Sequence, residues 1–346
     1  MFNSVHMAKY AKRRELGIEL DDPRVVKFVG YFGEGSYVGC ERALMIKDIF
    51  HRRSVPYVYN KDILNYELDV DRFEEMLAED VAKGLIPFWF GFSYGNTFSS
   101  AIDVSERALE VCKRHNIFIH VDAAWLGSTW ISEKYRPDPK LMKAVDSIDI
   151  NFTKLLLNGT GGSLFFIADK KLIVESFGSG DTKFPFWKNK FSGKDDVVDY
   201  KDWTVGNTRR NNAIKLYYMY DHFGLKKIRE AVEGMQEKYE YLISLIEGET
   251  LFFQMHTRQY GLVNFRALGK DGEPCNELTK AISAKVANIV EGFSTPGSFQ
   301  DREMIRIVVG QFHTTKEQLK AYFDAIMRAT RSERENVTGK EECSTE

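Results

Sequence analysis

Two ionisable residues of opposite charge, Asp122 and Lys154, each stand at or just after an apolar, strand-like run. Asp122 ends the run IFIHVD, and Lys154 follows the alternating run SIDIN after a short connection. The carboxyl ends of parallel strands meet at one edge of an open sheet, so we expect the two side chains to lie close together. A carboxylate and an amine in one place can hold a proton and bond covalently to a carbonyl carbon.

This pair matches what pyridoxal phosphate (PLP) requires from a protein. Asp122 can hold a proton on the pyridine nitrogen, and Lys154 can form the Schiff base that anchors the cofactor. Each residue alone has a plainer interpretation, because most lysines are solvated and an aspartate at a strand end often caps a turn. The apolar run after Lys154, closed by Gly159 and Gly161, predicts apolar surroundings that lower the pKa of its amine.

The sequence around these residues resembles the group II PLP-dependent amino acid decarboxylases, most closely the aromatic amino acid decarboxylases. The resemblance runs from about residue 3 to residue 325. The segments that carry it are GLIPFWFGFSYGNTFSSAIDVSERALEVCKRHNIFIHVDAAW, SIDINFTKLLL, DYKDW and QYGLVNFRAL. It implies PLP as cofactor and decarboxylation of an L-amino acid to its amine and carbon dioxide. DYKDW and QYGLVNFRAL favour an aromatic substrate, whereas VDAAW is closer to the glutamate branch.

The resemblance also implies roles for individual positions. Lys154 matches the lysine that binds the cofactor covalently, and Asp122 the partner of the pyridine nitrogen. Ala124 matches the small residue on one face of the ring, and Tyr37 stands where the family has a histidine on the other face. His120 lies on the same side of its strand as Asp122 because strand side chains alternate, and we expect it to take part in catalysis.

Four further positions match polar residues of the family. Thr97 matches a threonine near the cofactor, and Asn151 a residue that helps to hold the phosphate. Thr153 replaces the histidine before the lysine, so its hydroxyl can donate one hydrogen bond to a phosphate oxygen but brings no positive charge. Arg306 in MIRIVVGQ matches a family arginine, although it could equally be an ordinary charge on a sheet.

Two departures bear on activity. Residues 155–199 contain no tyrosine, although the family's mobile catalytic loop carries one there, and the segment offers Lys183, Phe184, Phe186 and Trp187 instead. In relatives, loss of that phenol accompanies oxidative deamination to an aldehyde. The opening FNSVHMAKYAKRRE resembles the helix after the family's phosphate-binding segment, so we expect that segment to be absent. An active decarboxylase, an aldehyde-forming variant and a noncatalytic paralogue with a binding or regulatory role all stay open.

Alternating strand and helix patterns predict an α/β fold with helices on both faces of a mainly parallel sheet. The resemblance implies the type I, aspartate aminotransferase-like fold of PLP enzymes. Expected strands lie within 25–33, 54–60, 86–95, 117–125, 147–151 and 162–169, with helices within 70–84 and 104–116. We expect a large cofactor-binding domain over 1–212, a smaller α+β domain over 213–330 that begins with two consecutive helices, and a disordered tail over 331–346.

Composition and charge limit the classes of partner that we expect the chain to bind. A net charge of −2 provides no basic field for nucleic acid or a membrane surface, and no apolar run is long enough to span a bilayer. The four cysteines lack metal-ligand spacing, so no metal site is expected, and with no signal peptide they predict a cytoplasmic protein. The resemblance implies a small-molecule amino acid substrate and a homodimer, or a heterodimer with a full-length relative.

A glycine-rich turn over 33–39 offers one competing interpretation. It follows a strand and resembles a dinucleotide-binding fingerprint. Such a site needs an acidic residue at the end of the next strand to bind a ribose, whereas YVYNKD places Asn60 and Lys61 before any acid. A dehydrogenase is therefore disfavoured, and it would leave Asp122 and Lys154 unexplained.

Overall fold

The computed structural model describes the chain except for residues 157–160, 179–189, 192–196, 207–209, 290–291 and 338–346. Its largest sheet has the strand order β2-β1-β5-β6-β7-β8. β2, β1, β5, β6 and β7 are parallel, and β8 is antiparallel to β7, which confirms a mainly parallel sheet. The strands are β1 (Phe28–Gly33), β2 (His51–Val55), β5 (Ile86–Ser93), β6 (Phe118–Asp122), β7 (Ser147–Asn151) and β8 (Ser163–Ile167).

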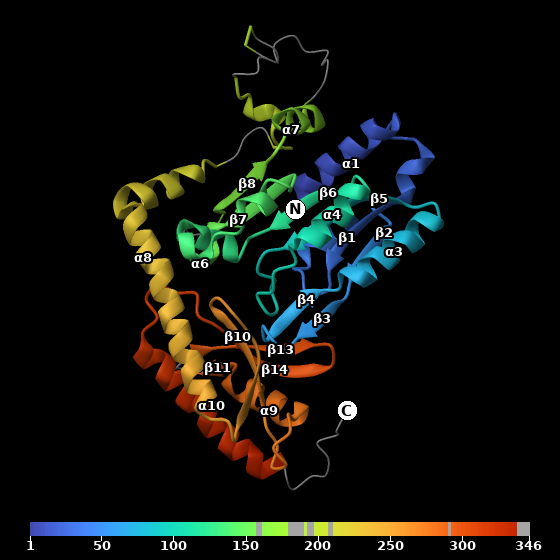
Figure 1. The fold of residues 1–346 in the computed structure, drawn as a ribbon. Helices are drawn as coiled ribbons and strands as arrows, with labels where there is room; N and C mark the ends of the chain where they lie inside the picture. Colours follow the sequence, from blue (N-terminus) through green and yellow to red (C-terminus); the bar gives the residue numbers. More distant parts are fainter. Residues whose placement is uncertain (157–160, 179–189, 192–196, 207–209, 290–291, 338–346) are drawn as a thin grey trace.

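Helices cover both faces of this sheet (Figure 1). On one face, α1 (Phe2–Leu16), α2 (Gly39–Ile46) and α7 (Lys170–Phe177) enclose a core with Trp89 and Phe118. On the other, α3 (Val70–Ala82) and α4 (Glu106–Arg114) pack on Phe90 and Ile119. Because strand side chains alternate, each central strand contributes to both cores. Shorter elements are η1 (Pro23–Lys27), η2 (Leu126–Ile131), η3 (Glu133–Tyr135), α5 (Pro139–Met142), α6 (Phe152–Leu155) and η5 (Tyr200–Asp202).

One local expectation differs from the structure. The strand expected over 54–60 is divided at Pro56: β2 joins the main sheet, whereas β3 (Tyr57–Asn60) pairs antiparallel with β4 (Asn65–Leu68). Proline has no backbone N–H to donate to a continuous ladder. The expected helix over 104–116 is α4, which begins after Ser105, whose hydroxyl caps Ala108 N at 3.2 Å.

The second sheet is antiparallel, with the order β13-β14-β10-β9. α8 leads into it and departs from helical geometry at Gly224 (φ 72°, ψ 157°), so the expected two consecutive helices meet at that residue. α8, α9 and α10 pack against this sheet around a separate core (Figure 1). The elements are α8 (Ala213–Glu247), β9 (Phe253–Gln259), β10 (Leu262–Ala267), α9 (Asn276–Val286), β11 (Asn288–Ile289), β12 (Gly292–Phe293), β13 (Thr295–Phe299), β14 (Arg302–Val308) and α10 (Lys316–Val337).

α10 continues into the segment that we expected to be a disordered tail. It ends at Val337, and the Arg334 guanidinium donates hydrogen bonds to the carbonyl oxygens of Leu251 (3.1 Å) and Gly269 (2.7 Å). These hydrogen bonds hold the helix further than composition suggested, and the rest of the expected tail, 338–346, lies outside the described residues. The division into domains at residue 212 stays a prediction. Within the described residues, no helix is long and apolar enough to cross a membrane.

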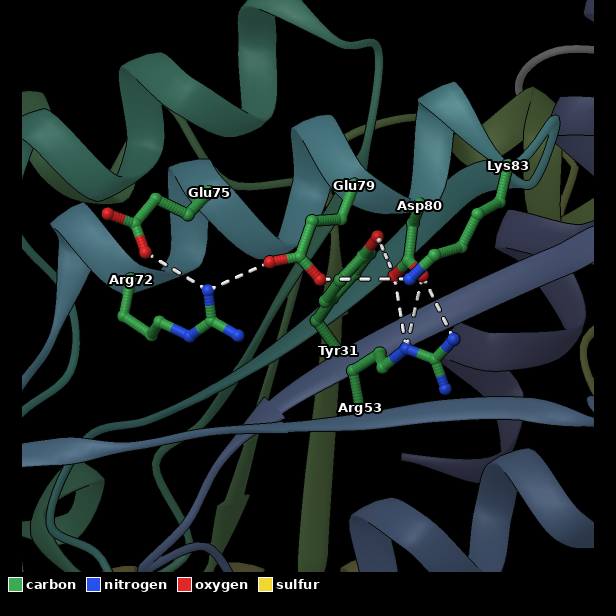
Figure 2. A network of polar contacts seen from close by, with 7 residues as sticks. All are labelled: Tyr31, Arg53, Arg72, Glu75, Glu79, Asp80 and Lys83. Carbon is green, nitrogen blue, oxygen red and sulfur yellow. Dashed lines mark hydrogen bonds and ion pairs between the residues drawn. The ribbon is translucent and has the colours of Figure 1, made fainter.

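A buried carboxylate joins α3 to the main sheet (Figure 2). Asp80 is 2% exposed; it accepts a hydrogen bond from Tyr31 Oη at 2.9 Å and contacts Arg53 Nη2 at 2.9 Å. Burial and the Asp80 charge raise the pKa of Tyr31. The preceding residue, Glu79, faces solvent: it accepts from Arg72 Nη1 at 3.0 Å, and its side chain is 51% exposed.

We expect Asp80→Ala to lower the free energy of unfolding by about 3 kcal/mol, because it leaves the buried Tyr31 phenol and the half-buried Arg53 guanidinium without their acceptor. Glu79→Ala is the matched control on the same helix and should change stability by less than about 0.5 kcal/mol. Urea denaturation followed by circular dichroism measures both. Equal effects of the two substitutions would contradict this account of the α3 contact.

Candidate active site

The carboxyl ends of β5, β6 and β7 lie level with one another. Ser93, Asp122 and Asp149 are register partners across these three parallel strands. Asp122 is 7% exposed, and its Oδ1 accepts a hydrogen bond from Ala124 N at 3.0 Å in the turn that follows β6. Burial, followed by the negative charge of Asp149, raises the pKa of Asp122, while Lys154 acts in the opposite direction. Asp122 and Lys154 therefore lie within electrostatic reach, as their spacing suggested.

Lys154 stands on the short helix α6 directly after β7. Asn151 caps this helix: its Oδ1 accepts from Thr153 N at 2.9 Å and from Thr153 Oγ1 at 2.6 Å. Phe152 and Leu155 occupy the buried positions of the turn, which leaves Lys154 exposed. Lys154 is therefore open to solvent, although apolar side chains line the cavity beside it.

A cavity of about 350 Å³ brings several of the expected residues together. Tyr37 reaches it from the loop after β1, and Thr97 from the loop after β5. Lys154 and Trp125 line it from the segments after β7 and β6, and Arg306 comes from β14 of the second sheet. The complete lining is Tyr37, Asn96, Thr97, Trp125, Lys154, Leu262, Arg306 and Val308.

Arg306 is tied to both parts of the chain. Its Nη1 donates to Thr295 Oγ1 at 2.9 Å, and its Nη2 donates to the Thr97 carbonyl oxygen at 2.8 Å. Its Nε is buried and has no hydrogen-bond partner among the described residues. Burial lowers the pKa of Arg306, so an anion in the cavity would stabilise its charge. Arg306 is thus part of the cavity wall rather than an ordinary charge on a sheet.

Five expected residues do not line the cavity: Asp122, Ala124, His120, Asn151 and Thr153. His120 is fully buried, and its Nδ1 lies 2.9 Å from Ser147 Oγ. Burial lowers the pKa of His120, which keeps the ring neutral near pH 7. Asn151 and Thr153 are hydrogen-bonded to each other. We therefore see no direct path for His120 to donate a proton to a ligand in the cavity.

Sequence reasoning did not name three residues of this region: Asn96, Trp125 and Asp149. Asn96 and Trp125 stand just after strand ends, where open α/β sheets place ligands, so that rule could have found them. Asp149 could not be found in this way, because its place beside Asp122 depends on the strand register. The expected loop residues Lys183, Phe184, Phe186 and Trp187 lie outside the described residues.

A protein-family comparison identifies the class of protein. The pyridoxal-dependent decarboxylase conserved domain matches residues 17–268, which is most of the chain. The chain belongs to this family, as the resemblance predicted.

Individual relatives are similar to this chain in sequence, and a solved structure is similar to it in fold. Tyrosine decarboxylase 2 of Arabidopsis thaliana is 25% identical over 304 residues, which cover 87% of this chain and 55% of the relative. Phenylacetaldehyde synthase of the same plant is 26% identical over 296 residues, covering 85% of this chain and 60% of the relative. The chain thus spans little more than half the length of these curated relatives. A crystal structure of Oryza sativa TDC with PLP and tryptamine superposes with a TM-score of 0.87 at 22% identity, covering 96% of this chain and 68% of that one.

Proposed function

We propose that the chain binds PLP through Lys154 and Asp122 and removes the α-carboxylate of an aromatic L-amino acid, giving an amine and carbon dioxide. The observation that carries the proposal is that Lys154, Trp125 and Arg306 line one cavity while Asp122 lies buried within electrostatic reach of Lys154. Family membership and decarboxylase relatives for aromatic amino acids support it.

The residues present suit this cofactor. Lys154 offers an exposed amine for its aldehyde, Asp122 a buried carboxylate for its ring nitrogen, and Tyr37 an aromatic face beside the cavity. When bound, the cofactor supplies an electron sink for the electron pair that carbon dioxide leaves behind. Asp122 holds the proton at the ring nitrogen that this sink requires.

The remaining lining residues suit an aromatic amino acid. The unpartnered Nε of Arg306 can donate a charge-assisted hydrogen bond to the substrate carboxylate and so orient the bond that breaks. Trp125, Leu262 and Val308 provide apolar wall for an aromatic side chain. Lys154 Nζ, freed when the substrate amine takes its place, can return a proton to the substrate carbon.

An aldehyde product is the second candidate. Residues 155–199 contain no tyrosine, and one relative is a phenylacetaldehyde synthase. An aldehyde requires an oxidant such as dioxygen in addition to the amino acid, and releases ammonia. Among the described residues, Tyr37 is the one tyrosine that lines the cavity. In the absence of a tyrosine within 155–199, its phenol is the one that could protonate the substrate carbon there. We also propose that the chain forms a dimer, either with a second copy of itself or with a longer relative.

The test is to incubate the purified chain and PLP with tyrosine, tryptophan, phenylalanine, glutamate and cysteine sulfinate. We expect carbon dioxide release with an aromatic amino acid and an equal amount of amine. Aldehyde, ammonia and hydrogen peroxide in place of the amine would favour the second candidate. Release of carbon dioxide from the acidic substrates alone would contradict the aromatic assignment, and no release from any of them would contradict catalysis by this chain.

A further inference from the structure

Asp122 has a second carboxylate beside it. In the register of β6 and β7, His120 pairs with Ser147 and Asp122 pairs with Asp149. Side chains of register partners in neighbouring parallel strands point to the same face of a sheet, and every second residue of one strand does so too. The four polar side chains therefore form one cluster, which lies next to the α6 turn that carries Lys154.

Hydrogen bonds within the cluster do not satisfy Asp149. His120 Nε2 lies 3.2 Å from Asp149 Oδ1, within ion-pair distance but without hydrogen-bond geometry. Both atoms are buried and lack a hydrogen-bond partner among the described residues, and His120 is fully buried. A buried acceptor without a donor costs free energy. No hydrogen bond to Oδ1 from the described residues therefore offsets the charge of Asp149.

Several charged or titratable groups surround Asp149, and they lie on β6, α6, α2, the start of α1 and the loop after β5. Asp122 repels it from β6, and Lys154 attracts it from α6. The Met1 amino group on the α1 side lies 3.9 Å from Asp149 Oδ2. Burial raises the pKa of Asp149, but the attracting groups outweigh it and hold that pKa below its usual value. Two further titratable groups lie nearby. Burial followed by Asp122 raises the pKa of the Cys40 thiol on α2, and the Asp103 carboxyl accepts from Ser93 N at 2.8 Å, with a pKa that burial raises to about 7.

Asp149 therefore keeps its negative charge next to Asp122. Two neighbouring carboxylates in a buried place repel each other, and a cation that binds beside one of them relieves that repulsion. A ring nitrogen that carries a proton is such a cation, and its neutral form is not.

Resting on the proposed function, we propose that Asp149 is a positioning residue of the cofactor site. Together with Asp122 it forms a carboxylate pair that selects the protonated form of the cofactor's pyridine nitrogen. Asp122 would contact the nitrogen. Asp149 would act through its negative charge, which favours a proton shared between Asp122 and the nitrogen.

The test compares PLP with its carbocyclic analogue, deazapyridoxal phosphate, in which carbon replaces the ring nitrogen. Both form the same bond to Lys154, so the ratio of their dissociation constants isolates the nitrogen. We expect Asp149→Asn to weaken PLP binding about tenfold and to leave the analogue unchanged, since a nearby charge shifts a protonation equilibrium by about one pH unit or more. With ring-¹⁵N-labelled cofactor, the NMR shift should report deprotonation about one pH unit lower in the variant.

Three further variants make the result specific. Asp149→Glu, which keeps the charge, should restore most of the ratio, and Asp149→Ser serves if the asparagine variant does not fold. Asp146→Asn is the matched control, because Asp146 lies just before β7, at its opposite end, where its Oδ2 accepts from Ile119 N at 2.7 Å. If Asp149→Asn weakens the binding of both cofactors equally, or changes neither dissociation constant, this inference is overturned while the proposed function stands. Failure of the unmodified chain to bind either cofactor would overturn it together with the proposed function.

Discussion

Replacing Lys154 by alanine is expected to lower kcat for decarboxylation at least about a thousandfold, the largest effect of any single substitution. The variant loses both the amine that bonds to the cofactor and the amine that can return a proton from the cavity wall. Initial rates of carbon dioxide release at saturating cofactor and substrate measure kcat directly.

Lys61→Ala controls for the loss of a lysine, because Lys61 is exposed in the turn between β3 and β4. It should leave kcat unchanged. Lys154→Arg keeps the positive charge but cannot form the covalent bond, so it should be as inactive as the alanine variant. Activity in Lys154→Arg close to that of the unmodified chain would mean that the lysine serves only as a charge.

Arg306→Ala is expected to lower kcat/KM for an aromatic amino acid about a hundredfold. Loss of a desolvated, hydrogen-bonded charge pair costs about 2–5 kcal/mol, and a hundredfold change corresponds to the lower part of that range. Because the carboxylate is absent from the amine product, product inhibition by the amine should be nearly unchanged. Steady-state kinetics with the amine as inhibitor separates these two effects.

Arg302→Ala is the matched control on the same strand. Arg302 contacts Tyr66 Oη at 3.3 Å at the start of β14 and does not line the cavity. It should change kcat/KM less than about threefold. Arg306→Lys should be intermediate, because it keeps the charge without the planar fork. If Arg306→Ala weakens the amine as much as the amino acid, Arg306 supports the cavity through Thr97 and Thr295 rather than binding the carboxylate.

Apolar periodicity predicted most of the segments that form the strands and helices around the main sheet, because buried strands and amphipathic helices differ in their apolar spacing. It did not separate β3 from β2, although Pro56 between them interrupts strand pairing and β3 pairs with the nearby β4 instead. It also could not predict the length of α10, whose last turn is held by hydrogen bonds from Arg334 to residues far away in the sequence.

The site was predictable in part. Lys154, Tyr37 and Thr97 follow strand ends and line one cavity, and Asp122 lies buried within electrostatic reach of Lys154. Strand alternation put His120 beside Asp122 but could not show that it is buried away from the cavity. The pairing of Asp122 with Asp149 and the approach of Arg306 from the second sheet both depend on tertiary contacts that no single segment encodes.

Borohydride reduction of the chain with PLP, followed by peptide mass spectrometry, tests the central claim most directly. The account predicts a near-visible absorption band that reduction abolishes and one modified lysine, Lys154. It also predicts that Lys154→Ala shows neither the band nor the modification, while Lys61→Ala shows both. Modification of a different lysine, or no band in the unmodified chain, would contradict the account.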